Sequence, residues 1–123
     1  MRLPAISGLR LCGHALTLQL DLPADLPQLD GHFPGVPILP AVAQVDWAAS
    51  LARDHLDLPP RFQALRSLKF LRIIQPPVRL ELELTRSDDG RAVSFKYLHE
   101  HTVCSSGRIE FAHDAAGLDR SLL

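Results

Sequence analysis

Hydrophobic and polar residues alternate in the first part of the chain. Between residues 8 and 21, Leu16, Leu18 and Leu20 are separated by polar side chains. A repeat of two residues places every second side chain on the same face of a β-strand. The pattern therefore predicts a first strand over residues 8–21 with one buried face.

Residues 41–56 follow a helical pattern. Strong helix formers dominate this range and neither Gly nor Pro interrupts it. Pro40 stands where a helix can begin, because its missing N–H would have no helical partner there. Apolar side chains cover more than one narrow stripe of such a helix, namely those of Ala41, Val42, Val45, Ala48, Ala49, Ala52 and Leu56. We therefore predict a central helix that is enclosed on most sides.

The rest of the chain supplies a sheet to enclose this helix. Four stretches alternate or are rich in β-formers, at residues 62–74, 78–86, 92–99 and 102–112. They are separated by Pro76-Pro77, by a hairpin signal at Asp89-Gly90 and by a short turn around Glu100. A strand, a buried helix and then hairpin-linked strands predict an α+β fold, in which an antiparallel sheet packs on one helix. The length of 123 residues predicts a single domain, residues 1–123.

Charge and composition narrow the classes of partner and compartment. The formal net charge is -1, so no overall field attracts nucleic acid or an anionic membrane. No stretch approaches the ~18 consecutive apolar residues that cross a bilayer. We expect a cytoplasmic globular protein. Cys12 and Cys104 lie in predicted strands without metal-ligand or CxxC spacing, and buried reduced thiols are expected.

A long loop precedes the helix. Residues 23–40 hold five prolines and two glycines, so neither a helix nor a central strand can persist there. Long connections without regular structure are usually functional. His32 lies in this loop, and Asp46 lies on the helix among Ala, Val and Trp side chains. An unpaired carboxylate in apolar surroundings is costly to ionise, so we expect Asp46 to have a raised pKa and to act as a general acid. His32, with an ordinary pKa of ~6.5, is the natural general base of this pair.

The loop and helix carry a resemblance to a known family. The segment HFPGVPILPAVAQVD, residues 32–46, resembles the active-site segment of the 3-hydroxyacyl-[acyl-carrier-protein] dehydratases of fatty-acid synthesis. In that family a His-Phe-x-Gly-x-Pro-x-x-Pro-Gly run is followed by an acidic residue on the central helix. The residues that match the run are His32, Phe33, Gly35, Pro37 and Pro40, with Asp46 as the acid. The similarity extends loosely over residues 30–113 and is greatest to the small dehydratases of aryl-polyene gene clusters.

The resemblance implies a fold and a mechanism. The fold would be a hot-dog fold, a curved antiparallel sheet wrapped around a long central helix, in a homodimer or higher oligomer whose sheets join edge to edge. Each site would take its histidine from one subunit and its acid from the other. On a 3-hydroxyacyl chain held by the phosphopantetheine of an acyl carrier protein, His32 would remove the α-proton and Asp46 would protonate the departing hydroxyl. The backbone N–H of Ala41 would bind the thioester oxygen.

Other residues have weaker assignments. Phe33, Gly35 and Trp47 are expected to contact the substrate, Trp47 by lining the acyl tunnel, although a large aromatic residue beside a core helix is more often simply packing. Arg66, Lys69 and Arg72 form a basic cluster that either meets an acidic carrier protein or is a solvated strand face. His99 and His101 are interpreted as a surface pair, because a zinc site needs three or four protein ligands. No metal or organic cofactor is expected, since the elimination needs only an acid, a base and an oxyanion site.

The chain also departs from the family pattern. Ala41 replaces a glycine, Ser50 replaces a glutamine one turn after the acid, and Pro77 replaces a glycine in a later Pro-Gly pair. Two other functions stay open: a hot-dog thioesterase, which would use a helix carboxylate to activate water, and a non-catalytic acyl-binding partner of another dehydratase, which Ala41 and Ser50 keep open. The sequence predicts neither the length nor the chemistry of the acyl chain.

Overall fold

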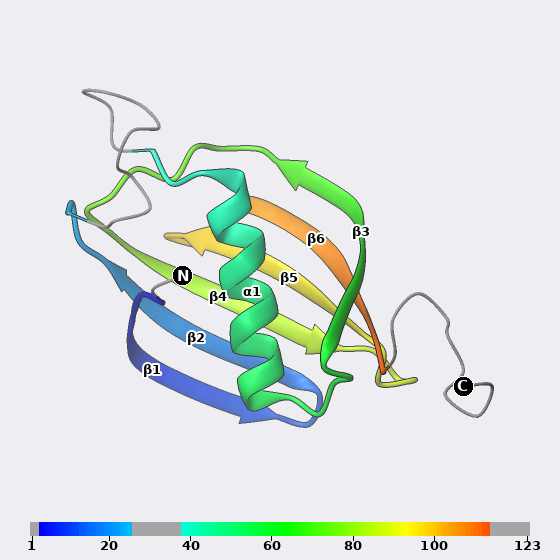
Figure 1. Ribbon diagram of the computed structural model, residues 1–123. Coiled ribbons are helices and arrows are strands. Elements are labelled where there is room, and N and C mark those ends of the chain that lie inside the picture. The colour runs from blue at the N-terminus through cyan, green and yellow to red at the C-terminus, as the bar shows by residue number, and fades with distance from the viewer. Residues whose placement is uncertain (1–2, 26–37, 114–123) are drawn as a thin grey trace.

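In the part of the chain that the structure describes, one antiparallel sheet curves around one helix. The computed structural model describes residues 3–25 and 38–113. Within these ranges the elements are β1 (Ala5–Cys12), β2 (Ala15–Leu22), α1 (Ala41–His55), β3 (Arg61–Phe70), β4 (Val78–Arg86), β5 (Ala92–His99) and β6 (Thr102–Ala112). The strands form a six-stranded sheet in the order β1-β2-β4-β5-β6-β3. Figure 1 shows this sheet curving around α1, which lies against its concave face. The predicted α+β arrangement is confirmed.

Alternating leucines place the core between the sheet and the helix. Leu18 of β2 pairs with Leu82 of β4, and every second side chain on both strands is buried. From the helix, Trp47, Ala48 and Leu51 are buried against this face. The predicted enclosure of the helix holds for these residues but not for its start, where Ala41 and Val42 are exposed.

The predicted single strand over residues 8–21 is wrong. The chain reverses there, because Cys12 pairs with Ala15 across a two-residue turn made by Gly13 and His14. Gly13 has a φ of 61°, a conformation that glycine adopts without steric cost. The hydrophobic pattern does not reveal this turn, because hydrophobic and polar residues alternate on both sides of it.

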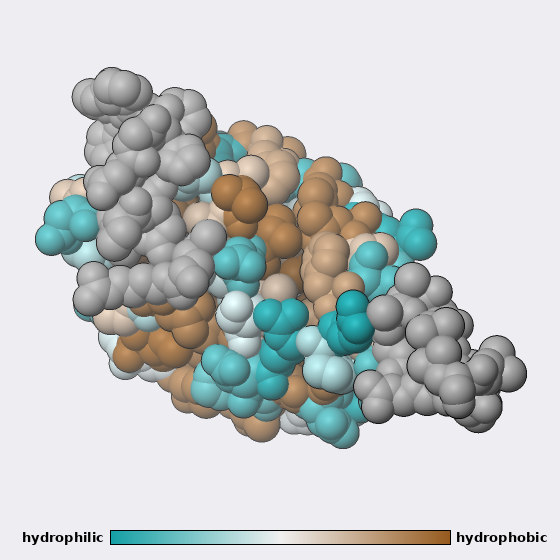
Figure 2. Space-filling view, viewed as in Figure 1, coloured by the Kyte–Doolittle hydropathy of each residue, from teal (hydrophilic) through white to brown (hydrophobic). Residues whose placement is uncertain are grey.

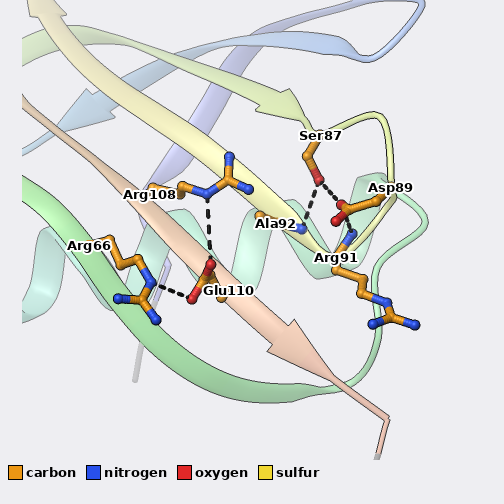
Figure 3. A network of polar contacts seen from close by, with 7 residues as sticks. All are labelled: Arg66, Ser87, Asp89, Arg91, Ala92, Arg108 and Glu110. Carbon is orange, nitrogen blue, oxygen red and sulfur yellow. Dashed lines mark hydrogen bonds and ion pairs between the residues drawn. The ribbon is translucent and has the colours of Figure 1, made fainter.

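The later hairpins follow the sequence prediction. The bounds of β4, β5 and β6 agree with the predicted ranges. In the turn between β4 and β5, Gly90 N donates a hydrogen bond to the Ser87 carbonyl at 3.0 Å. In the same turn, drawn in Figure 3, the Ser87 hydroxyl donates to the Asp89 carboxylate at 2.6 Å. Glu100 and His101 form the turn between β5 and β6, both with positive φ.

Strand β3 ends earlier than the predicted range of 62–74. Its pairing with β6 shifts register between Arg66 and Lys69, where Ser67 takes a φ of 56°. Beyond Phe70 the chain leaves the ladder, and the N–H groups of Leu71 and Arg72 both donate to the Cys104 carbonyl, at 2.8 and 3.0 Å. β3 is the last strand in the sheet order and so forms one edge of the sheet. The segment that follows it is hydrogen-bonded to β6 through Cys104.

The two cysteines differ in their exposure to solvent. Both thiols are free, and Cys104 is buried as predicted, but Cys12 is exposed. The prediction fails for Cys12 because it lies on β1, the other edge of the sheet.

No helix in residues 3–25 and 38–113 is long and apolar enough to cross a membrane.

Candidate active site

Asp46 lies on α1 between the half-buried Val45 and the fully buried Trp47, and is itself half-buried. Its electrostatic effect reaches strand β5. Burial raises the pKa of the Tyr97 phenol well above its usual range, and the Asp46 carboxylate raises it further. Asp46 is therefore a half-buried carboxylate on α1 whose charge acts on a buried phenol of β5.

The start of α1 opens onto a pocket. Pro40 is the N-cap residue and makes no side-chain capping hydrogen bond. The first helical hydrogen bond in the described residues runs from Gln44 N to the Pro40 carbonyl, at 3.2 Å. N–H groups in the first turn of a helix have no partner within the helix, and they carry the positive end of its dipole. Beside them lies a pocket of about 250 Å³ lined by Ile38, Leu39, Pro40, Ala41, Gln44, Phe70, Leu71, Arg72 and Ile73.

A buried polar network lies directly behind this pocket. The Ser105 hydroxyl donates to Oε1 of Gln44 at 2.6 Å, and Nε2 of Gln44 donates to the Leu39 carbonyl at 3.2 Å. The Tyr97 hydroxyl donates to the main-chain carbonyl of Gln44 at 2.7 Å. The first turn of α1 is thus hydrogen-bonded to both β5 and β6.

A larger pocket, of about 560 Å³, lies elsewhere. It includes Gln19 and Glu81, which pair in register on the sheet face opposite α1, as well as His99 and His101. His99 lies 3.9 Å from the Glu100 carboxylate, and no group of metal-ligating residues occurs in the part of the chain that the structure describes. We take the smaller pocket as the candidate site, because it adjoins the helix start and the turn that precedes Asp46.

Comparison with known proteins identifies the family. The sequence model of the ApeI-like family, described as ApeI dehydratase, matches residues 10–108. The chain belongs to the ApeI-like dehydratase family. This confirms the resemblance inferred from the sequence and supports a dehydratase, that is a hydro-lyase, activity in general. No curated protein sequence matches the chain significantly.

Solved structures agree with this assignment. The dehydratase heterocomplex ApeI:P from Xenorhabdus doucetiae contains a chain that is 30% identical, with a TM-score of 0.81 over 89% of this chain and 97% of that chain. An uncharacterized protein from Erwinia carotovora subsp. atroseptica is 28% identical, with a TM-score of 0.72 over 89% and 95%. The dehydratase domain from the CurK module of the curacin polyketide synthase is 18% identical, with a TM-score of 0.61 over 98% and 46%, and shares the fold. The predicted hot-dog fold is confirmed.

Only some of the predicted site residues of this ApeI-like chain lie within the residues that the structure describes. Ala41 lines the pocket, and Asp46 lies about one turn further along α1; the roles of Ala41 in oxyanion binding and of Asp46 as an acid stay predictions. His32, Phe33 and Gly35 lie outside the described residues. Trp47 has no exposed surface and belongs to the core, so a role for it in lining an acyl tunnel stays a prediction.

The three residues of the predicted basic cluster lie in different surroundings. On the face of β6 away from α1, Nε of Arg66 lies 2.7 Å from the Glu110 carboxylate, which Arg108 also approaches at 3.9 Å (Figure 3). Arg72 instead lines the pocket beside Ala41, and Lys69 is exposed beyond the bulge in β3. Carrier-protein docking by these three residues stays a prediction.

Sequence reasoning missed Gln44, Tyr97 and Ser105. Gln44 was visible as an amide in the first turn of a helix that is otherwise apolar. Its closeness to Asp46 was a signal that could have been used. Nothing local marks Tyr97 or Ser105, because their importance depends on strand pairing.

Proposed function

We propose that this ApeI-like chain removes water from a 3-hydroxyacyl thioester on the phosphopantetheine of an acyl carrier protein and forms the trans-2-enoyl thioester. The chemistry fits the fatty-acid or polyene class of biosynthesis. One observation carries the proposal at residue level: a half-buried carboxylate, Asp46, lies on the helix whose uncapped start adjoins a pocket. Family membership supports the reaction class.

The elimination needs three groups. In the proposal His32, assigned from its family motif, takes the α-proton, and the electron pair of that C–H bond forms the new double bond. The bond from the β-carbon to oxygen breaks, and Asp46 gives its proton to the departing hydroxyl, which leaves as water. The N–H of Ala41 stabilises the negative charge that develops on the thioester oxygen, helped by the helix dipole. Transfer of the proton from His32 back to Asp46, directly or through solvent, restores the starting state.

Substitution of the acid and the base tests this mechanism. Asp46→Asn and His32→Ala should each lower the dehydration rate by at least ~100-fold, the low end of what a positioned proton transfer contributes. The two effects should not add, since both residues serve one elimination. Enoyl formation is measured by mass spectrometry on a 3-hydroxyacyl carrier protein.

Matched controls come from the same chain. Asp54→Asn changes an exposed carboxylate on α1, and His14→Ala changes an exposed histidine in the first hairpin turn. Both controls should keep the wild-type rate. A folded Asp46→Asn variant that also keeps the wild-type rate would exclude this mechanism.

A second candidate function is that of a partner subunit without catalysis of its own. The 30% identical relative is described as part of a dehydratase heterocomplex, which favours this alternative. Ala41 and Ser50, which replace the family's Gly and Gln, are also compatible with it. The purified chain alone is incubated with the 3-hydroxyacyl carrier protein, and both enoyl product and free thiol are measured. Formation of the enoyl product supports the dehydratase, and release of free thiol indicates a thioesterase. Absence of both products supports the partner subunit.

We further propose that two copies of the chain associate through β3. This edge strand carries the exposed apolar side chains of Phe62, Leu65, Leu68 and Phe70. Figure 2 shows hydrophobic surface gathered along β3 and at the start of α1. An unpaired apolar edge is a template for pairing with another strand. Because residues that follow β3 line the candidate pocket, a second chain at this edge would lie next to the site.

Sedimentation tests the assembly. The wild type should be a dimer at micromolar concentration, and Phe62→Arg should shift it towards monomer by placing a charge in the interface. Leu9→Arg is the matched control, because Leu9 is equally exposed on β1 at the opposite edge. A fully active monomer would contradict the proposal. A chain that dimerises only with a different hot-dog protein would replace the homodimer with a heteromer.

A further inference from the structure

Two polar side chains are buried in the core of the described residues. Gln44 is 4% exposed and Ser105 is 0% exposed. Burying an amide or a hydroxyl is costly unless it is hydrogen-bonded. These two satisfy one another, through the 2.6 Å hydrogen bond from the Ser105 hydroxyl to Oε1 of Gln44. An apolar pair would fill the same space without this requirement, so the pair calls for a reason beyond packing.

The pair is attached to the chain that enters the helix. Nε2 of Gln44 donates to the carbonyl of Leu39 at 3.2 Å, and the N–H of Leu39 donates to the Ile74 carbonyl at 2.8 Å. Leu39 is therefore held through both of its backbone polar groups, and its side chain is buried. The direction in which the chain enters α1 is set two residues before Ala41.

Both walls of the pocket are attached to neighbouring residues of β6. Ser105 holds the helix side through Gln44. Cys104, the preceding residue, holds the opposite side, because its carbonyl accepts the N–H groups of Leu71 and Arg72. Since Leu71 and Arg72 line the pocket together with Ala41 and Gln44, the dipeptide of Cys104 and Ser105 fixes the distance between the two walls.

Strand β5 adds a third attachment. The Tyr97 hydroxyl donates to the main-chain carbonyl of Gln44 at 2.7 Å. A carbonyl oxygen has two lone pairs, so this bond can coexist with the helical one. The first turn of α1 is thus fixed by its own backbone, by β5 and by β6.

Such fixation matters for the backbone donors at the helix start. Hydrogen-bond donors stabilise a developing oxyanion only when they are held in place before the reaction, and small displacements are costly in rate. We propose that Gln44 and Ser105 are positioning residues, whose buried hydrogen bond holds the first turn of α1 so that its N–H groups meet the thioester oxygen. This inference rests on the proposed dehydratase function.

Four variants test the positioning role by kinetics. Ser105→Ala and Gln44→Met remove the hydrogen bond with little change in shape, and each should lower kcat about tenfold while KM changes less than about twofold. Ser105→Thr keeps the hydroxyl and should restore most of kcat. Ser106→Ala is the control, since Ser106 is the next residue on β6 and is half-buried. A folded Ser105→Ala variant with the wild-type kcat would overturn the inference.

A second measurement separates this inference from the proposed function. In the NMR spectrum of uniformly labelled protein, Ser105→Ala should shift the amide signals of Ala41, Val42 and Ala43, whereas Ser106→Ala should leave them in place. Absence of a shift in Ser105→Ala would refute the positioning role whether or not the protein is an enzyme. If the shift occurs but the wild type dehydrates no 3-hydroxyacyl thioester, the structural part of the inference stands and the dehydratase proposal fails.

Discussion

Tyr97 offers a quantitative test of the packing behind the candidate site. It is the only tyrosine in the chain, so the absorbance of tyrosinate reports on this residue alone. Burial raises the pKa of Tyr97 well above its ordinary value of about 10, and the Asp46 carboxylate adds to the rise. The folded protein should therefore keep the phenolic proton at a pH where the unfolded chain releases it. Stability linked to Tyr97 is complete below about pH 10 and is lost as the pH rises above it.

The size of this loss follows from linkage. Each pH unit above the unfolded pKa lowers the free energy of unfolding by about 1.4 kcal/mol for one retained proton. Tyr97→Phe removes this dependence, but it also removes the hydrogen bond to the Gln44 carbonyl, which contributes about 1 kcal/mol. The variant should therefore be the less stable protein at neutral pH. The two stability curves should cross between about pH 10 and 11, where the linkage loss equals the lost hydrogen bond.

Denaturation of both proteins by urea from neutral pH to about pH 11 measures the crossing. Trp47, the only tryptophan, reports unfolding by fluorescence, and tyrosinate absorbance reports ionisation. Lysine and cysteine ionisation affects both proteins alike and cancels in the difference. The reasoning fails if tyrosinate forms with a midpoint near pH 10, the ordinary value, while Trp47 fluorescence is still native.

Two further predictions concern β-structure. Gly107→Ala would bring a new Cβ to 2.6 Å from Leu68 Cδ2 and 2.7 Å from Phe95 Cε2, so it should lower the free energy of unfolding by about 1–3 kcal/mol, measured in urea. Hydrogen bonds from the Ser87 hydroxyl and the Arg91 N–H lower the pKa of Asp89, so this carboxylate stabilises the fold above its unfolded pKa of about 4 and loses that effect as the pH falls. Asp89→Asn should lower Tm at neutral pH, and Asp88→Asn is the control; an equal loss of Tm at acidic pH would contradict the explanation.

The fold could be predicted largely from alternation and from turn chemistry. β4, β5 and β6 have the predicted bounds, because alternating side chains lead up to turns that Gly90 and Glu100 mark. The reversal at Gly13 was missed, because a strand and its hairpin partner can carry one continuous alternation. The end of β3 was missed for a different reason. Its apolar pattern continues through Leu71 to Ile74, although the backbone leaves the ladder after Phe70.

The candidate site, like the fold, could be predicted from the sequence only in part. The positions of Ala41 and Asp46 follow from the spacing of a motif on one loop and one helix, which is local information. Two partners of Gln44, Tyr97 and Ser105, lie 53 and 61 residues away along the chain. Whether Ser105 or Ser106 faces the helix depends on the register shift between Tyr97 and Leu98 in the pairing of β5 with β6. A shift of one residue exchanges the two faces of a strand, so sequence alone could not choose between the two serines.

Exposed apolar residues beside the pocket connect the proposed assembly to the proposed chemistry. Leu71 is 63% exposed and Ile73 is 65% exposed, while Ile74, the next residue, is buried and its carbonyl holds Leu39. Fully burying one such side chain contributes roughly 1.5–3 kcal/mol, so a chain that covered this segment would bind with a substantial part of its energy at the pocket itself. The same covering would exclude water from the helix start, where hydrogen bonds to a developing oxyanion are stronger in a less polar environment. Association and turnover should therefore depend on the same surface, and a charge at Ile73 should weaken both.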